Sequence, residues 1–169
     1  MCFTGHRHLP ADTAELETRL DQCLRHLYRL GYRTFYCGAA LGFDMLAAER
    51  TLYLRARCPE VRLVMVLPCA DQDARWPERE RNRHLYLTGA ADERVVLAPG
   101  YYEGCMMVRN RWMVDRSAFC LCYLIAPKGG TVSTVTCAAR EGLALLNLAI
   151  PEKCAAFLRL RTAPAGPEE

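Results

Sequence analysis

Two glycines and a threonine, Gly129-Gly130-Thr131, stand between an apolar segment and a segment of helical character. Small residues at such a turn let a ligand approach the backbone, and the free amides at the start of a helix can hold a phosphate together with the threonine hydroxyl. The same glycines are equally typical of an ordinary turn, so both interpretations stay open from these residues alone. Neither Gly-x-Gly-x-x-Gly nor the Walker pattern with Gly-Lys-Ser/Thr occurs, which disfavours the standard dinucleotide-binding and P-loop classes.

Two aspartates are the candidates for acid or base chemistry. Asp44 stands at the start of an expected helix, where a carboxylate commonly complements the helix dipole and where it can also hold ribose hydroxyls or exchange a proton. Asp115 follows Arg111 by four residues, and an ion pair within one helix is the simpler explanation of that spacing. We therefore name Asp44 and Asp115 as catalytic candidates and keep the structural alternative beside each.

Polar and small residues also follow the other predicted strands. In an open sheet of parallel strands the carboxyl ends share one edge, and ligands bind there. At this edge Arg7 and Arg111 would supply positive charge, and Trp76 would stack on a base. The predicted ligand-binding residues are Thr4, Gly5, His6, Arg7, Gly38, Ala39, Gly42, Asp44, Gln72, Trp76, Asn110, Arg111, Gly129, Gly130 and Thr131.

The elements that must position these residues alternate along the chain. Apolar, β-rich segments predict strands at 2–4, 34–37, 61–67, 94–97, 118–125 and 144–150. Helical spacing predicts helices at 12–31, with Asp12 and Glu15 as a capping box, and at 41–57, 105–116 and 131–142, with a short helix leading into Leu87. The pattern predicts an α/β fold, a three-layer Rossmann-like open and mainly parallel sheet with helices on both faces. We expect one domain over residues 1–161 and a flexible tail at 162–169.

Composition narrows the class of protein. The 169 residues carry 22 Lys plus Arg and 19 Asp plus Glu, a formal net charge of +3. No apolar run approaches the roughly 20 residues that span a bilayer, and no secretory signal precedes Phe3, so we expect a cytoplasmic protein without a membrane partner. The ten cysteines are expected to be reduced, with Cys120 and Cys122 on one side of a strand. No Cys or His spacing matches a metal site, and the modest charge argues against nucleic acid as the partner.

Five separated segments form one combined pattern. They are Phe3-Thr4-Gly5-His6-Arg7, residues 38–49 from Gly38 through Asp44 to Glu49, Pro68 with Gln72 and Trp76, residues 110–115, and Lys128-Gly129-Gly130-Thr131. In this order, over residues 3–150, they resemble the YpsA-like (also YspA-like) family of the SLOG superfamily, a Rossmann-like group named for DprA and the LOG phosphoribohydrolases. The resemblance implies a bacterial protein with a nucleotide or ADP-ribose-like ligand over the glycine turns, a link to stress or cell division, and a homodimer.

The chain departs from the catalytic members of that superfamily at two places. The LOG glycine turn reads Pro-Gly-Gly-x-Gly-Thr-x-x-Glu, whereas here Thr134 stands where a carboxylate is needed for cleavage of an N-glycosidic bond. Ala39 also stands where relatives often have glycine. We therefore favour binding of a small-molecule nucleotide derivative, with a sensor or regulator role. The alternatives are a phosphoribohydrolase-like enzyme acting on nucleoside monophosphates through Asp44 or Asp115, single-stranded nucleic-acid binding, and a protein-interaction module with a vestigial pocket.

Overall fold

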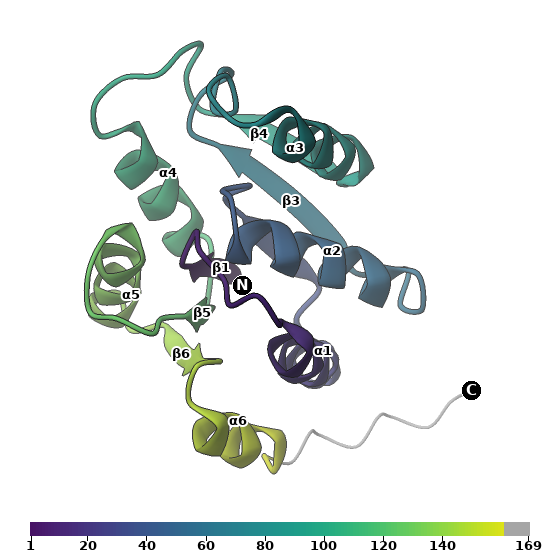
Figure 1. Ribbon diagram of the computed structural model, residues 1–169. Coiled ribbons are helices and arrows are strands. Elements are labelled where there is room, and N and C mark those ends of the chain that lie inside the picture. The colour runs from purple at the N-terminus through teal and green to yellow at the C-terminus, as the bar shows by residue number, and fades with distance from the viewer. Residues whose placement is uncertain (161–169) are drawn as a thin grey trace.

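Six parallel strands form a single open sheet in the computed structural model, which describes residues 1–160. The strands are β1 (Cys2–Gly5), β2 (Thr34–Cys37), β3 (Arg62–Leu67), β4 (Glu93–Val96), β5 (Phe119–Tyr123) and β6 (Ala144–Asn147), in the order β4-β3-β2-β1-β5-β6. The helices are α1 (Ala14–Arg29), α2 (Phe43–Arg55), α3 (Glu78–Ala90), α4 (Cys105–Val114), α5 (Gly130–Arg140) and α6 (Pro151–Leu158). Figure 1 shows the helices on both sides of the sheet, which confirms the predicted three-layer α/β fold.

The two faces of the sheet carry two separate apolar cores. One core packs α1, α2, α3 and α6 against the sheet, and the other packs α4 and α5 against the opposite face. Strand β5 serves both, because alternate side chains of a strand point to opposite faces. Leu121 lies in the first core, while Cys120 and Cys122 lie in the second, as predicted. All ten cysteines are free thiols.

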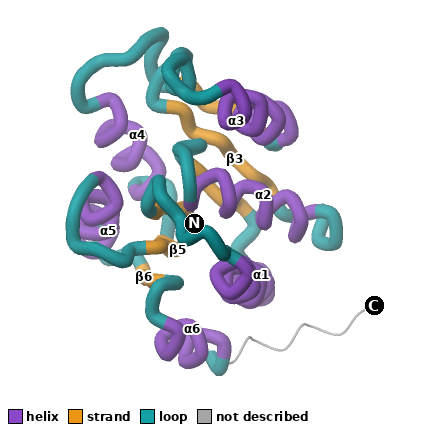
Figure 2. Tube along the Cα trace, in the orientation of Figure 1, coloured by secondary structure: helices purple, strands orange, loops and turns teal. Residues whose placement is uncertain are grey.

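The chain changes direction across the sheet at one place. From β1 it proceeds outward through β2, β3 and β4, and α4 then carries it back to β5 on the other side of β1. The segment after β1 therefore leads toward α1 on one face, and the segment after β5 leads toward α5 on the other, as Figure 2 shows. Such a divergence leaves a crevice at the carboxyl ends of the two strands, and ligands of open α/β sheets bind in it.

Most element boundaries follow the prediction to within a few residues, and two details differ. The capping box is wrong because helix α1 begins one residue later than it requires. Thr13 precedes the helix, the Ala14 amide donates to Asp12 Oδ1 at 2.9 Å, and Glu15 pairs with Arg19. The strand predicted at 144–150 ends at Asn147, and helix α6, which was not predicted, follows it. The expected tail at 162–169 lies outside the described residues, and none of the described helices is long and apolar enough to cross a membrane.

The contribution of β5 to both apolar cores gives a test of the core. Leu121 is fully buried, so Leu121→Ala should lower the free energy of unfolding by about 2–5 kcal/mol through lost burial and the cavity left behind. Leu85→Ala is the matched control, because that leucine on α3 is 67% exposed and its truncation should change stability by less than about 0.5 kcal/mol. Denaturant unfolding followed by circular dichroism measures both, and equal losses would contradict the assigned core.

Candidate functional site

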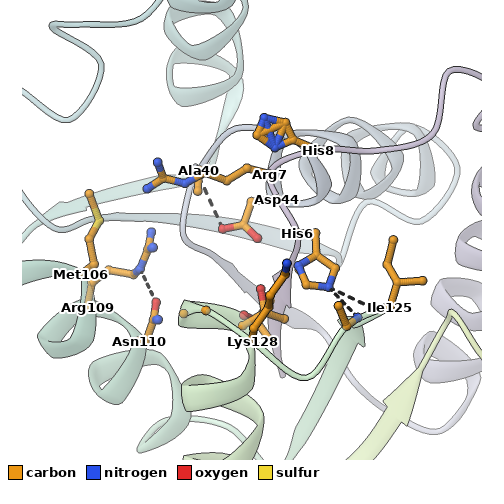
Figure 3. A pocket seen from close by; sticks show the side chains of 16 residues that line it. His6, Arg7, His8, Ala40, Asp44, Met106, Arg109, Asn110, Ile125 and Lys128 are labelled. Carbon is orange, nitrogen blue, oxygen red and sulfur yellow. Dashed lines mark hydrogen bonds between the residues drawn. The ribbon is translucent and has the colours of Figure 1, made fainter.

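A cavity of about 670 Å³ opens at the carboxyl ends of β1, β2 and β5, at the crevice described above. Its walls come from the loops after these strands and from the amino-terminal halves of α4 and α5 (Figure 3). The lining residues are Thr4, Gly5, His6, Arg7, His8, Ala40, Asp44, Met106, Arg109, Asn110, Ile125, Ala126, Lys128, Gly129, Gly130 and Thr131. Segments from both halves of the chain thus meet around one space.

The glycine turn forms one wall at the start of α5. Gly129 has a φ of +83°, a backbone conformation that residues other than glycine rarely adopt. It directly precedes Gly130, the first residue of α5. The first amides of a helix have no partner within it and carry the positive end of the helix dipole. Thr131 is buried beside them and Lys128 is exposed at the opening, so this wall combines free amides, a hydroxyl and a cation.

His6 ties the loop after β1 to the loop after β5. Its Nε2 accepts hydrogen bonds from the amides of Ile125 at 3.0 Å and Ala126 at 3.3 Å, and its own amide donates to the Tyr123 carbonyl at 3.2 Å. An imidazole nitrogen that accepts is unprotonated, so the proton of the neutral ring lies on Nδ1. His6 thereby fixes the segment that leads into the glycine turn, and Figure 3 shows these contacts at the edge of the cavity.

Asp44 is the first-turn carboxylate of α2 and is almost completely buried, with 5% of its surface exposed. Its Oδ2 accepts one long hydrogen bond, of 3.4 Å, from the Ala40 amide. Burial raises the pKa of Asp44 to about 6, and the charges of Arg109 and Arg7 with the Ala40 amide keep it from rising further. The carboxyl group therefore titrates close to neutral pH at the wall of the cavity.

Arg109 of α4 is equally buried, also with 5% of its surface exposed. Its Nη1 donates to the Gly38 carbonyl, and its Nε donates to Asn110 Oδ1 at 2.7 Å. Burial lowers the pKa of the guanidinium, and the nearby Asp44 carboxylate opposes that shift. Among residues 1–160 no carboxylate lies within 4.0 Å of this cation, so Arg109 and Asp44 influence each other without forming an ion pair.

The turn after β2 brings these two charges together. A Cβ at Gly38 would overlap the Arg109 guanidinium and lie 2.7 Å from Asp44 Oδ2, so both groups press on a position that only glycine can fill. Gln72 supports the same turn, because its side-chain amide donates to the carbonyls of Gly38 at 3.3 Å and Ala39 at 3.2 Å. Ala39 has a φ of +54°, the sole residue other than glycine with positive φ within residues 1–160. The left-handed conformation is strained for alanine.

A hydrogen-bonded chain joins Arg109 to the glycine turn. Asn110 accepts from Arg109, and its side-chain nitrogen donates to Thr134 Oγ1 at 2.7 Å. The Thr134 hydroxyl in turn donates to the Gly130 carbonyl at 3.0 Å. Thr134 is 1% exposed and does not line the cavity, so it holds α5 against α4 rather than facing a ligand.

The structure sorts the predicted site residues into three groups. Nine line the cavity: Thr4, Gly5, His6, Arg7, Asp44, Asn110, Gly129, Gly130 and Thr131. Four others build its frame from behind: Gly38, Ala39, Gly42 and Gln72. Gly42 belongs to this second group because its φ is +81° and a Cβ there would overlap the backbone of Arg7.

Three predicted residues lie away from the cavity. Arg111 and Asp115 form the expected ion pair at 2.6 Å on the exposed side of α4, where Arg111 also contacts Glu141 at 2.8 Å. Trp76 packs edge to face on His84, with 5.2 Å between ring centroids. The structure therefore places neither the second catalytic candidate nor the proposed stacking residue where a ligand in this cavity would contact it.

The prediction from sequence did not include Arg109, although it included the adjacent Asn110 and the nearby Arg111. A usable signal was present, because Arg109 stands four residues after Cys105 and four before Met113, and all three share the buried stripe of α4. Arg111 is two residues off that stripe and faces solvent. Met106 and Ile125 are apolar cavity residues that were also missed, as was His8.

Comparisons with known proteins give a family model and curated relatives that match this chain. A family model described as the YspA SLOG family matches residues 10–141. The UPF0398 protein of Oceanobacillus iheyensis is 26% identical over 108 residues, which cover 63% of this chain and 58% of the relative. That of Halalkalibacterium halodurans is 26% identical over 104 residues, covering 60% and 55%. The chain thus spans somewhat more than half the length of these curated relatives.

Solved structures show the same fold at low sequence identity. DNA processing protein A (DprA) from Streptococcus pneumoniae aligns with a TM-score of 0.59 and 15% identity, over 94% of this chain and 55% of that one. DNA processing protein A from Helicobacter pylori, described for its single-stranded DNA binding mode, aligns with a TM-score of 0.58 and 19% identity, over 85% and 62%. At these identities the likeness concerns the arrangement of helices and strands.

The buried carboxyl group predicts a distinct dependence of stability on pH. With a folded pKa of about 6 and an ordinary value of 3.8 when unfolded, Asp44 stays protonated in the folded protein between about pH 4 and pH 6, where the unfolded chain has released the proton. Stability from this group is therefore complete below pH 4 and is lost as pH rises through 6. Compared with Asp44→Asn, the unmodified protein should lose about 2–3 kcal/mol of unfolding free energy between pH 4 and pH 7. Denaturant unfolding across that range measures the difference, and a pH-independent difference would contradict the assignment.

Proposed function

Since the chain belongs to the YspA SLOG family, we propose that the cavity at its strand ends binds a phosphorylated ribose compound, a nucleotide or an ADP-ribose-like derivative. The observation that carries the proposal is that two kinds of recognition group face one space. The amides at the start of α5 lie on one wall, and the buried Asp44 and Arg109 lie on another. The first suits a phosphate and the second suits a polar, uncharged sugar.

The phosphate is assigned to the wall formed by Gly129, Gly130 and Thr131. Open space surrounds the position where either glycine would carry a Cβ, so an anion can reach the amides directly. Lys128 and Arg7 are exposed on the lining and add positive charge at the opening. The sugar then extends toward Asp44, and Met106 and Ile125 offer apolar surface for the base in place of the more distant Trp76.

The biological role proposed for this binding is that of a sensor or regulator in the cytoplasm of a bacterium. The ground is the family resemblance to proteins linked with stress physiology and cell division. No cofactor is required for such a role, since the ligand itself is the signal. Association into a homodimer is proposed on the same ground.

A second candidate function is hydrolysis of an N-glycosidic bond, and the protonation of Asp44 favours it. A buried carboxyl with a pKa of about 6 suits a group that exchanges protons near neutral pH. Incubation with nucleoside 5′-monophosphates and chromatography for free base tests it. Base release that is lost in Asp44→Asn would establish the enzyme, whereas binding without release would leave the protein a receptor.

Two further functions make different predictions for the same protein. Single-stranded DNA binding, as described for the Helicobacter pylori protein, predicts affinity for an oligonucleotide that falls steeply with salt. A protein-interaction module with a vestigial pocket predicts no stabilisation by any nucleotide. The net charge of +3 and the accessible glycine turn favour a small ligand over both.

A thermal-shift screen tests the proposed function. Reduced protein is heated with AMP, GMP, CMP, UMP, NAD and ADP-ribose at millimolar concentrations. A compound present at about 100 times its dissociation constant should add about 2.7 kcal/mol to stability, which is a rise of roughly 5–10 °C for a domain of this size.

Gly130→Asp and Gly130→Asn form the matched pair for this screen. Both side chains enter open space at the first residue of α5, so both variants should fold. Only the aspartate carries a charge that repels phosphate, so the shift should disappear in Gly130→Asp and remain in Gly130→Asn. Absence of a shift for every compound with the well-folded unmodified protein would contradict the proposed function, and equal shifts in the two variants would contradict the place of the phosphate.

A further inference from the structure

Asp44 and Arg109 present opposite charges to the same part of the cavity and leave part of each group unused. Of the two carboxylate oxygens, Oδ2 accepts the single bond from Ala40 and Oδ1 has no partner among residues 1–160. Of the guanidinium nitrogens, Nε and Nη1 donate to protein oxygens, whereas Nη2 has no partner within that range. Both residues line the cavity, and both are 5% exposed.

Such an arrangement is costly unless something else completes it. A buried charge without hydrogen bonds loses the solvation that it had in water, and an ion pair is the usual compensation. Here the frame prevents closer approach, because Arg109 is held by the Gly38 carbonyl and by Asn110, and Asp44 is held by its helix and the Ala40 amide. A ligand that supplies a donor to one group and an acceptor to the other would satisfy both.

The chemistry of that ligand is restricted by the two charges. A second phosphate or a carboxylate would suit Arg109 but would be repelled by Asp44, and an ammonium group would suit Asp44 alone. Two hydroxyls on neighbouring carbons suit both, because one donates to the carboxylate while the oxygen of the other accepts from the guanidinium. Among phosphorylated ribose compounds, this pair of hydroxyls is the 2′,3′-cis-diol.

We propose that Asp44 and Arg109 together recognise the 2′,3′-cis-diol of ribose, so that the cavity selects ribonucleotides and rejects 2′-deoxyribonucleotides. The inference rests on the proposed nucleotide-binding function and makes it more specific. Loss of the 2′-hydroxyl leaves one buried charge without its partner, and a site built for a hydroxyl rejects a ligand that lacks it more strongly than an apolar site does. The selection also separates this cavity from a DNA-binding surface.

Titration calorimetry with matched nucleotides tests the proposal on the unmodified protein. The probes are the ribonucleoside 5′-monophosphate that gives the largest thermal shift, its 2′-deoxy counterpart, and the arabinose analogue, whose 2′-hydroxyl points to the opposite face of the sugar. We expect the 2′-deoxy and arabinose compounds to bind about 10- to 100-fold more weakly than the ribonucleotide, the range expected for a hydrogen bond to a charged group.

Two variants separate selection for the sugar from affinity for the phosphate. Asp44→Asn keeps the size of the side chain and one acceptor oxygen but removes the charge, so the ratio of the deoxy to the ribo dissociation constant should fall several-fold toward one. Lys128→Ala removes an exposed cation of the phosphate wall, so it should weaken both nucleotides by the same factor and leave the ratio unchanged. The comparison of nucleotides on the unmodified protein decides the matter even where Asp44→Asn does not fold.

Each result has a separate meaning. Equal affinity of the unmodified protein for the ribo and 2′-deoxy compounds would overturn the proposed recognition of the diol while leaving nucleotide binding intact. A preference that is undiminished in a folded Asp44→Asn variant would overturn the part assigned to Asp44. Failure of both compounds to bind at millimolar concentration would overturn the proposed function and this inference with it.

Discussion

Close approach at Gly38 is the constraint on which the site depends. Arg109 comes from α4 on one face of the sheet and Asp44 from α2 on the other, and they meet over the end of β2 because no side chain occupies position 38. The Gly38 carbonyl accepts from Arg109 and from Gln72, so the same residue that permits the meeting also fixes its geometry. Any larger residue there would separate the cavity's buried charges.

The cost of this arrangement lies in the folded state without ligand. The two buried, unlike charges attract each other but share no direct hydrogen bond that would offset their lost solvation, and the turn beside them holds Ala39 in a strained conformation. The two separate cores supply the stability that tolerates it, since the large buried side chains around Leu121 and Met113 lie away from the crevice. The strained turn and the two charges thus lie together at the edge of the sheet that carries the cavity.

The sequence predicted the fold more completely than the site, for physical reasons. Alternation of apolar strands and helices, with glycine or proline between them, is a local pattern, so the α/β class and the cavity-lining segments 4–7 and 129–131 could be found without coordinates. Trp76 and Arg111 were misplaced relative to the cavity because the direction of a side chain depends on the packing of its element. Trp76 turns toward His84, and Arg111 is held by Asp115 and Glu141 on the solvent side. Arginines are rarely buried, so the charge of Arg109 predicts a solvent-exposed side chain. Its position on the apolar stripe of α4 indicated the opposite, and the structure shows it buried.

The position of Thr134 limits the chemistry that the cavity could perform on the proposed nucleotide ligand. In the LOG glycine turn that the chain resembles, a glutamate stands at this position, whereas here the hydroxyl is sealed between Asn110 and the Gly130 carbonyl. Thr134 is part of the scaffold that links α4 to α5, and it does not line the cavity. Among the described residues the sole carboxylate lining the cavity is Asp44, which lies on a different wall from the glycine turn. A residue there can hold the sugar while the amides of α5 hold the phosphate. In the proposed binding mode, chemistry at the sugar would have to come from the same group that anchors it, so recognition is the function that this geometry supports first.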